Sequence, residues 1–399
     1  MSSFVRNAIV LGLLSAVGPF AIDMYLPAMP AIAADLQTST SATQLTLTMF
    51  FISFGLCQIA YGALSDRYGR KPPLYVGLAL FIAGAIGCAL APRIGWLIAF
   101  RVLQGAGAAA MGVIPRAIVR DLHTGAEATK LMALVMLVFS VSPILAPLTG
   151  SALIVPFGWR AVFVAVTIAA AIALVLVATV LPETRPAEAR VGGGLRGVLR
   201  SFGELLSDWR FLGLVYIGGL GMASFFVFLS TSSFVYIDHY GLTPTQYSLA
   251  FSINAIGFIG ASQFAGTLGD RFGSARVVMA AVTAYASFAV LLLALTLAGF
   301  DSLSLLIPML FASFAFLGLV IPSTMVLSLE NHGPIAGLAA ALSGTLQMVS
   351  GGVLIAIAGL FFDGTSLPMI ATIALTAVGA FAISAATLRG RALETSPAE

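Results

Sequence analysis

Twelve continuous apolar runs, each long enough to cross a lipid bilayer, restrict the fold of this 399-residue chain more than any other feature. A helix of about 20 apolar residues crosses the roughly 30 Å hydrocarbon core of a membrane. The strands of a membrane barrel would instead give short segments of alternating polarity. We therefore predict an all-α membrane protein. The runs lie at about 7–28, 43–64, 73–91, 95–116, 131–154, 160–181, 211–237, 245–266, 277–298, 303–325, 335–361 and 367–388.

The composition indicates that lipid surrounds most of this chain. Of its residues 59% are hydrophobic and only 9% are charged, whereas soluble domains carry about 25% charged residues. A soluble exterior must be covered by polar and charged side chains, and this chain has too few of them. The first run is expected to be a span and not a signal peptide, because residues 8–27 reach about 30 Å as a helix.

A polar stretch from Pro182 to Asp208, with four arginines, interrupts the apolar runs near the middle of the chain. Six runs precede it and six follow, so it is predicted to link two bundles. Its end is expected to form a short amphipathic surface helix at 195–208, with one side made of Leu195, Leu199, Phe202 and Leu206. The predicted domains are an N-terminal six-helix bundle at 1–182, a cytoplasmic linker at 183–208, a C-terminal six-helix bundle at 209–390 and a cytoplasmic tail at 391–399.

The basic residues are distributed unevenly between alternate loops, which predicts the orientation. If the N-terminus is cytoplasmic, the outer connections carry only Arg93 and Arg160 among the basic residues. Loops rich in lysine and arginine remain on the cytoplasmic side. Both termini and the linker are therefore expected in the cytoplasm, with the chain crossing the bacterial inner membrane many times. The aspartates that fall outside are Asp35, Asp238, Asp301 and Asp363.

An internal repeat relates the two sets of six runs. Gly62-Ala-Leu-Ser-Asp-Arg-Tyr-Gly69 recurs 204 residues later as Gly266-Thr-Leu-Gly-Asp-Arg-Phe-Gly273. Gly112-Val-Ile-Pro115 is echoed 207 residues later by Leu319-Val-Ile-Pro322. Each pair of copies falls at corresponding spans of the two sets. Two pseudo-symmetric halves in parallel orientation predict a substrate path between them, near the bilayer midplane.

Several functional classes find no support in the sequence. The basic residues do not form the clustered patch that nucleic-acid binding requires. No lysine follows a glycine as in a phosphate-binding loop, and the three histidines are scattered. A membrane enzyme or a channel would need a clustered catalytic set or a polar ring, and neither is found. We expect no enzyme activity, cofactor or metal, and transport driven by an ion gradient or by the gradient of the substrate.

Asp23 and Arg101 are ionisable residues inside apolar runs, where an uncompensated charge is costly. Asp23 lies roughly 10 Å below the outer end of the first span and Arg101 roughly 12 Å deep in the fourth, so the two could meet. One interpretation is a structural ion pair that holds the helices together. The other is a carboxylate that binds and releases a proton as its burial and its distance from Arg101 change. A lone carboxylate in a cavity could also attract a cationic substrate.

The second half has no charge at the corresponding positions. The position equivalent to Asp23 falls within an aromatic segment, Ser224-Phe-Phe-Val-Phe228. These aromatic side chains could face lipid or the protein core. If they face the path, they suit amphiphilic molecules that are held by apolar contacts with few polar groups. The plausible polar contributors in this half are Asn254, Gln263 and Gln347.

Three motifs resemble those of the major facilitator superfamily. The first is Gly62-Ala-Leu-Ser-Asp-Arg-Tyr-Gly-Arg-Lys71 after the second span. The others are Leu97-x-x-x-Arg101-x-x-Gln104-Gly105 in the fourth and Pro182-Glu-Thr184 after the sixth. With twelve spans, the resemblance covers essentially the whole chain. It implies two six-helix bundles and transport of a small molecule by alternating access.

Within that superfamily, Asp23-Met-Tyr-Leu-Pro27 and Val119-Arg-Asp121 resemble the Bcr/CflA branch of drug:proton antiporters. That branch exports compounds such as bicyclomycin, chloramphenicol and florfenicol. The resemblance implies that Asp23 is the proton-coupled carboxylate and Arg101 its basic partner. It also implies that a cytoplasmic charge cluster holds the two halves together when the inner side is closed, formed by Asp66, Arg70 and Asp121. A positive-inside anchor with a tight glycine turn is the alternative interpretation of that cluster.

Two departures from the branch pattern affect the expected function. The glycine-rich antiporter signature of the fifth span is present only as Ser142-x-x-x-Ala-Pro-x-x-Gly150-Ser151. A second carboxylate of some multidrug relatives is replaced near Ser15, which argues against a preference for cationic drugs. We predict a monomeric exporter of small drug-like molecules that works in the lipid bilayer and is coupled to protons. The alternative is export of a small metabolite, such as a sugar, nucleoside or amino acid. The predicted substrate contacts are Tyr25, Phe226, Asn254 and Gln347.

Overall fold

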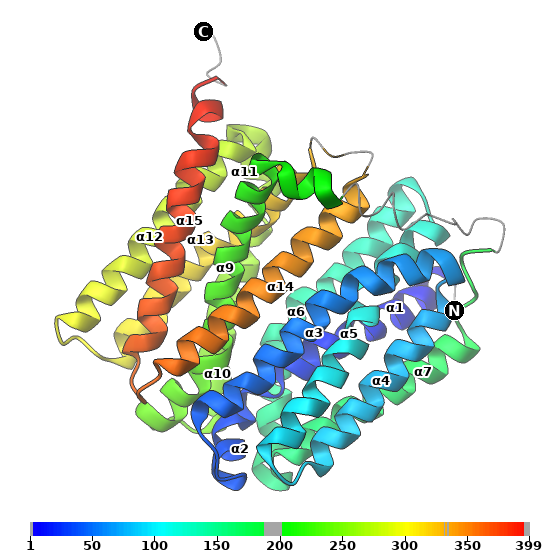
Figure 1. Ribbon diagram of the computed structural model, residues 1–399, viewed down its shortest axis with the longest axis horizontal. Helices are drawn as coiled ribbons and strands as arrows, with labels where there is room; N and C mark the ends of the chain where they lie inside the picture. Colours follow the sequence, from blue (N-terminus) through cyan, green and yellow to red (C-terminus); the bar gives the residue numbers. More distant parts are fainter. Residues whose placement is uncertain (1–2, 187–201, 331, 333–334, 395–399) are drawn as a thin grey trace. The chain divides into compact units, whose positions relative to one another are not determined.

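The computed structural model describes residues 3–186, 202–330, 332 and 335–394. Within these ranges the regular elements are all helical, and twelve helical stretches are long and apolar enough to cross a membrane. This confirms the predicted all-α architecture of twelve spans. The chain divides into two compact units, Met1–Gly193 and Gly194–Glu399, and the division falls inside the predicted linker (Figure 1).

The helices of the first unit run from the N-terminus to the start of the linker and are coloured blue to green in Figure 1. They are α1 (Ser3–Asp23), the 3₁₀ turn η1 (Leu26–Ala28), α2 (Met29–Asp35), α3 (Thr40–Tyr68), α4 (Lys71–Leu90), α5 (Ile94–Leu122), α6 (Gly125–Phe157) and α7 (Arg160–Thr179).

The helices of the second unit follow the linker and are coloured green to red in Figure 1. They are α9 (Trp209–Ser233), the π-helical segment η3 (Phe234–His239), α10 (Pro244–Ser262), α11 (Ala265–Phe272), α12 (Ser274–Leu297), α13 (Leu303–Leu329), α14 (Ala336–Leu360) and α15 (Leu367–Glu394). The last helix continues past residue 391, where the sequence placed the start of the tail.

The two units use the same set of helix pairs. In the first, α5 packs on α3 and α4, α1 packs on α6 and α7, and α4 packs on α7. In the second, α13 packs on α10 and α12, α9 packs on α14 and α15, and α12 packs on α15. Each pair of the first unit thus has a counterpart in the second. The repeat seen in the sequence is therefore a repeat of structure, which fits the two pseudo-symmetric bundles predicted.

Glycines permit the closest helix contacts in both units. A Cβ atom at Gly105 of α5 would lie 2.4 Å from the carbonyl oxygen of Phe50 in α3. A Cβ atom at Gly318 of α13 would lie 2.1 Å from the carbonyl oxygen of Phe258 in α10. Small residues let helix backbones approach one another in a membrane, where packing and not the hydrophobic effect drives association. The same device therefore holds the second and fourth spans of each half together.

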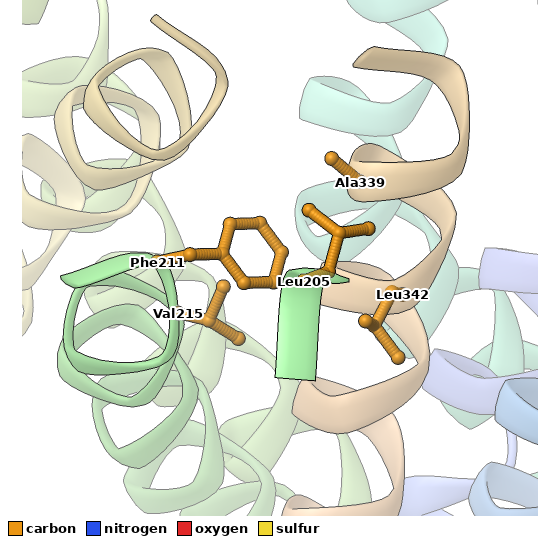
Figure 2. Packing of buried hydrophobic residues seen from close by; sticks show 5 residues of the cluster. All are labelled: Leu205, Phe211, Val215, Ala339 and Leu342. Carbon is orange, nitrogen blue, oxygen red and sulfur yellow. The ribbon is translucent and has the colours of Figure 1, made fainter. Parts of the chain in front are cut away.

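The C-terminal part of the linker packs into the second unit. Residues 202–207 are helical, and Leu205 is buried in a cluster with Phe211 and Val215 of α9 and with Ala339 and Leu342 of α14. Figure 2 shows Leu205 between the side chains of these two helices. Phe202 packs on the same cluster.

The predicted apolar side of the linker helix was partly wrong. Leu206 is half exposed, whereas its neighbour Leu205 is fully buried. Leu205 and Leu206 are consecutive, so their side chains point about 100° apart on a helix, and the direction of Leu205 is the one that faces α9 and α14. The other two predicted members, Leu195 and Leu199, lie outside the described residues.

Candidate functional site

A break in the first span places Asp23. Helix α1 ends at Asp23 and is followed by η1 and α2. Pro27 has no N–H to donate to the carbonyl of Asp23, which is the bond that would continue the helix. Asp23 is 5% exposed, and its carboxylate has no hydrogen-bond or ion-pair partner among the described residues. An acidic group is therefore held inside the first unit without a compensating charge.

Helix α6 fits closely against this break. A Cβ atom at Gly150 would lie 2.4 Å from the carbonyl oxygen of Met24 and 2.9 Å from its Cα. Twelve residues earlier on both helices, a Cβ atom at Gly12 would lie 3.5 Å from Val138, an ordinary contact. The two helices run in parallel, and they are closest beside Asp23. Gly150 therefore fixes the position of the backbone that carries the carboxylate.

Arg101 of α5 is fully buried and reaches α1. Its Nη1 donates to the carbonyl oxygen of Ala21 at 3.2 Å and to Oε1 of Gln104 at 2.7 Å. The guanidinium carbon lies 4.8 Å from the ring centre of Tyr25 and 4.3 Å from that of Phe50. Nε and Nη2 have no hydrogen-bond partner in the described part of the chain.

Arg101 and Asp23 therefore approach one another without forming an ion pair in this conformation. The hydrogen bond to Ala21 brings the guanidinium to a carbonyl two residues before Asp23. The arginine depends on a backbone dipole, an amide and two aromatic faces for its stabilisation. This arrangement leaves the carboxylate free to change its protonation without breaking a salt bridge.

Tyr25 is part of the wall around Arg101. Its hydroxyl forms a 2.7 Å hydrogen bond with Oγ1 of Thr46 in α3, and its ring contacts Phe163 of α7 at 5.6 Å. Gln104 and Thr46 were not among the predicted site residues. Gln104 stood within the motif of the fourth span, but nothing in the sequence indicated that Thr46 would pair with Tyr25.

Asp66, Arg70 and Asp121 come together in a cluster, and all three lie in the first unit. That the cluster holds the two halves together stays a prediction. Arg70 donates to Asp121 through Nε at 2.7 Å and Nη2 at 3.1 Å, and to Asp66 through Nη1 at 2.8 Å. Burial by itself would lower the pKa of Arg70, but the hydrogen bonds and charges of Asp121 and Asp66 outweigh it and raise that pKa. The guanidinium therefore stays charged and joins the loop after α3 to the end of α5.

The segment after α7 completes this cluster. The sequence analysis did not predict that this segment would take part. Glu183 accepts the backbone N–H groups of Arg70 at 2.8 Å and Lys71 at 3.0 Å, at the start of α4. The Thr184 hydroxyl donates to Asp121 at 3.0 Å, and Arg185 pairs with Asp66 at 3.2 Å. A carboxylate at a helix N-terminus satisfies free N–H groups and the helix dipole. The Pro182-Glu-Thr184 motif was the available signal.

The phenylalanines of the aromatic segment in α9 lie in two different environments. Phe225 stacks on Phe258 at 5.2 Å and Phe228 on Phe251 at 5.5 Å, so both belong to the core of the second unit. Phe226 points to α14, where a Cβ atom at Gly351 would lie 2.1 Å from its ring. The alternative of a packed core therefore holds for Phe225 and Phe228.

The other two predicted contacts lie on different helices. Gln347 of α14 approaches α9, where a Cβ atom at Gly218 would lie 3.5 Å from its Nε2. Asn254 of α10 is fully buried and donates through Nδ2 to the carbonyl oxygen of Ala250 at 3.2 Å. Its side chain interacts with Tyr236 of η3, which the sequence analysis did not single out.

One further cluster surrounds Asp301, in the loop between α12 and α13 of the second unit. His239 donates to the Asp301 carboxylate through Nε2 at 2.9 Å, the Ser366 hydroxyl donates to it at 2.8 Å, and the Tyr240 hydroxyl also donates to it. Burial opposes ionisation of Asp301, but these hydrogen bonds prevail and lower its pKa. The cluster, which we call the Asp301 clamp, joins η3 to the loops before α13 and α15.

Comparison of the sequence with known proteins identifies a family and several relatives. The sequence matches the family model described as Major Facilitator Superfamily over residues 11–356. It is 37% identical to "Uncharacterized MFS-type transporter YdgK" of Bacillus subtilis, over 93% of this chain and 92% of that protein. It is 29% identical to "Bicyclomycin resistance protein homolog" of Haemophilus influenzae, over 91% of each. It is 31% identical to "Chloramphenicol resistance protein" of Pseudomonas aeruginosa, over 73% of this chain and 68% of that protein.

Solved structures agree on the fold. A nucleoside transporter, NupG, superposes with a TM-score of 0.77 over 97% of this chain and 99% of its own, at 13% identity. A D-xylose-proton symporter gives 0.73 over 95% and 98%, at 16% identity. These likenesses concern the fold alone. The family model and the sequence relatives confirm the resemblance that the motifs indicated, and the solved structures agree with the fold.

Proposed function

This chain belongs to the major facilitator superfamily, and we propose that it exports small drug-like molecules in exchange for protons. Two relatives that match most of the chain carry names for resistance to bicyclomycin and to chloramphenicol. Such a transporter alternates between states open to either side of the membrane. We place it in the bacterial inner membrane with both termini in the cytoplasm, because the basic residues gather on that side.

The observation that carries proton coupling is the isolated carboxylate of Asp23. It is buried at a helix break and has no charged partner among the described residues. An ionised carboxylate that leaves water for an apolar interior is strongly penalised. A conformational change that admits water, or that moves Arg101 toward the carboxylate, would favour release of the proton. The opposite change would favour its uptake.

The charge cluster around Arg70 is proposed to act as a cytoplasmic latch. Its charged hydrogen bonds join the ends of α3 and α5, the start of α4 and the segment after α7. Hydrogen bonds between charged groups are roughly twice as strong as neutral ones. A conformation that separates these groups loses that stabilisation, so the cluster biases the balance between states.

Replacement of Asp23 by asparagine tests the coupling. In proteoliposomes loaded to give an imposed pH gradient, Asp23→Asn is expected to lose uphill chloramphenicol transport, because an amide cannot exchange a proton. Binding of chloramphenicol in detergent should remain. Asp35→Asn is the matched control, since Asp35 is half exposed and pairs with Arg160 at 2.8 Å. It should transport as the unaltered protein does. Unchanged pH-driven transport by Asp23→Asn would remove Asp23 from the mechanism.

A further inference from the structure

Three buried polar atoms in the second unit lack a satisfactory hydrogen bond. They are the hydroxyls of Ser233 and Tyr236 and Oδ1 of Asn254. The three residues have no exposed surface and lie at the end of α9, in η3 and in α10. A buried polar group without a partner costs about 1–3 kcal/mol, so the fold does not retain such groups for stability. In natural proteins each such group calls for an explanation, and a ligand is one.

Tyr236 and Asn254 are neighbours. The Tyr236 hydroxyl and the Asn254 amide are close enough to interact, but neither that hydroxyl nor Oδ1 of Asn254 has a hydrogen bond of normal geometry in the described part of the chain. Nδ2 of Asn254 is already used, because it donates to the carbonyl oxygen of Ala250. The pair therefore offers one hydroxyl, which can donate, beside one carbonyl oxygen, which can accept.

Other buried tyrosines of this unit are satisfied. Tyr247, whose ring lies 5.9 Å from that of Tyr236, forms a 3.2 Å hydrogen bond with Ser232. Tyr285 donates to Ser224 at 2.6 Å. The second unit thus provides a hydrogen-bond partner for a buried tyrosine hydroxyl where the tyrosine has only a packing role. Tyr236 differs from them, although it is equally buried.

The span interiors around this pair are uncharged. In the described spans of the second unit, acidic and basic residues occur only near the span ends, at Arg210, Asp238, His239, Asp270, Arg271 and Arg276. Asp238 and His239 follow Tyr236 in η3, but both are exposed. A charged ligand group at Tyr236 and Asn254 would find no buried countercharge, and burying it would be costly. The aromatic rings of Phe228 and Tyr247 beside Tyr236 add apolar surface.

We propose that Tyr236 and Asn254 form a hydrogen-bonding subsite for an uncharged hydroxyl or amide group of the transported molecule. The ligand group accepts from the Tyr236 hydroxyl and donates to Oδ1 of Asn254, while Ser233 supplies a further hydroxyl one turn away. The subsite lies wholly within the second unit. This inference rests on the proposed function and narrows its substrates to neutral molecules with at least one hydroxyl or amide.

Binding to purified protein in detergent tests the subsite without any proton gradient. Chloramphenicol and bicyclomycin are the neutral probes, and both carry hydroxyl and amide groups. Tetraphenylphosphonium, a cation that cannot form hydrogen bonds, is the contrasting probe. Titration calorimetry gives the dissociation constants, and the midpoint of thermal unfolding reports the fold.

Tyr236→Phe removes only the hydroxyl and is expected to weaken binding of a neutral probe about five- to tenfold. Asn254→Leu should act similarly. Neither substitution should change the dissociation constant for tetraphenylphosphonium. Tyr236→Phe should also leave the unfolding midpoint unchanged. Tyr285→Phe is the matched control, because its hydroxyl is paired within the protein. It should lower the midpoint and leave the affinity for the neutral probes within about twofold.

The outcomes separate this inference from the proposed function. Unchanged binding of neutral probes by Tyr236→Phe overturns the subsite, while transport that still depends on Asp23 leaves the proposed function intact. An equal loss with tetraphenylphosphonium, or with Tyr285→Phe, shows a general effect on the fold and also overturns it. Binding of the cation alone by the unaltered protein excludes a neutral substrate. Binding of none of the three probes overturns drug export, and the inference with it.

Discussion

Arg101 is held by groups that stabilise its charge without neutralising it. A guanidinium over an aromatic ring gains about 2 kcal/mol when both are removed from water, and Arg101 has two such rings as well as two hydrogen bonds. Two of its nitrogens still lack a partner among the described residues. An arginine that served only to join helices would be expected to have a carboxylate in contact. We infer that its incomplete pairing leaves it able to interact with Asp23 in another state.

The close contact at Gly150 predicts the effect of adding a single methyl group there. Gly150→Ala should destabilise the protein by about 1–3 kcal/mol, because the added methyl meets the backbone of Met24 and cannot be relieved by a side-chain rotation. It should also alter the pH dependence of transport, since the displaced backbone adjoins Asp23. Thermal unfolding in detergent and transport at several pH values measure the two effects.

Gly18→Ala is the control for this substitution. Gly18 lies on the same helix as Asp23, and a Cβ atom there would meet nothing within 4 Å. Its replacement should leave stability and transport unchanged, or raise stability slightly through the better helix propensity of alanine. Equal effects of the two substitutions would show that the close approach at Gly150 has no special role.

The helices of the first, seventh and eighth spans are interrupted. In the first span helix α1 ends at Asp23, and the seventh span changes from α9 to the π-helical η3 at Phe234. The eighth span is divided into α10 and α11 near Gln263, whereas its counterpart α3 is continuous. Such irregularities within membrane spans occur where backbone lines a site or moves. Two of the three adjoin the buried groups that we propose bind the proton and the substrate.

The Asp301 clamp predicts a pH dependence of stability at the end of η3. Because the native pKa of Asp301 is lowered, its contribution is complete above the ordinary value of 3.8 and is lost as the pH falls through the lower native pKa. Burial and the neighbouring Asp301 raise the pKa of Tyr240, so the contribution of its neutral hydroxyl is lost only when the pH rises well above 10. Between these limits the clamp should be intact.

Asp301→Asn should therefore lower stability at neutral pH by about 1–2 kcal/mol, allowing for the partial exposure of the carboxylate. The difference from the unaltered protein should diminish as the pH approaches 3. Asp363→Asn is the control on the same side of the unit, because Asp363 is bonded only locally to Thr365. It should change stability by less than about 0.5 kcal/mol. A pH-independent difference at Asp301 would contradict the clamp. Unfolding midpoints in detergent across pH measure both.

At the scale of the whole molecule, the two units share helix pairing and differ in chemistry. The first has the buried Asp23 and Arg101 and the latch around Arg70. The second has uncharged span interiors, an aromatic core and the linker segment docked through Leu205. A duplicated architecture thus holds a buried carboxylate and a buried arginine in one half and neutral hydrogen-bonding groups in the other.

The predicted orientation of the whole chain can be tested by labelling. In a background with Cys57 and Cys88 replaced by alanine, Ser207→Cys and Ser302→Cys place single exposed thiols at opposite ends of the spans. A membrane-impermeant maleimide should label Ser302→Cys in right-side-out vesicles and Ser207→Cys in inverted ones, because basic loops remain cytoplasmic. Labelling from the reverse sides would invert the topology and place the latch outside.

The sequence by itself determined the number of spans, their repeat and the place of the charged residues, because these depend on hydropathy along the chain. It also indicated the cluster of Asp66, Arg70 and Asp121, since motif and loop position bring those residues to one level. Only the tertiary structure decided which groups meet. Arg101 lies against Ala21, Glu183 binds the start of α4, Leu205 is buried in place of Leu206, and Tyr236 lies beside Asn254. These contacts join segments far apart in the chain, and the packing of side chains between helices selects them in ways that local pattern does not encode.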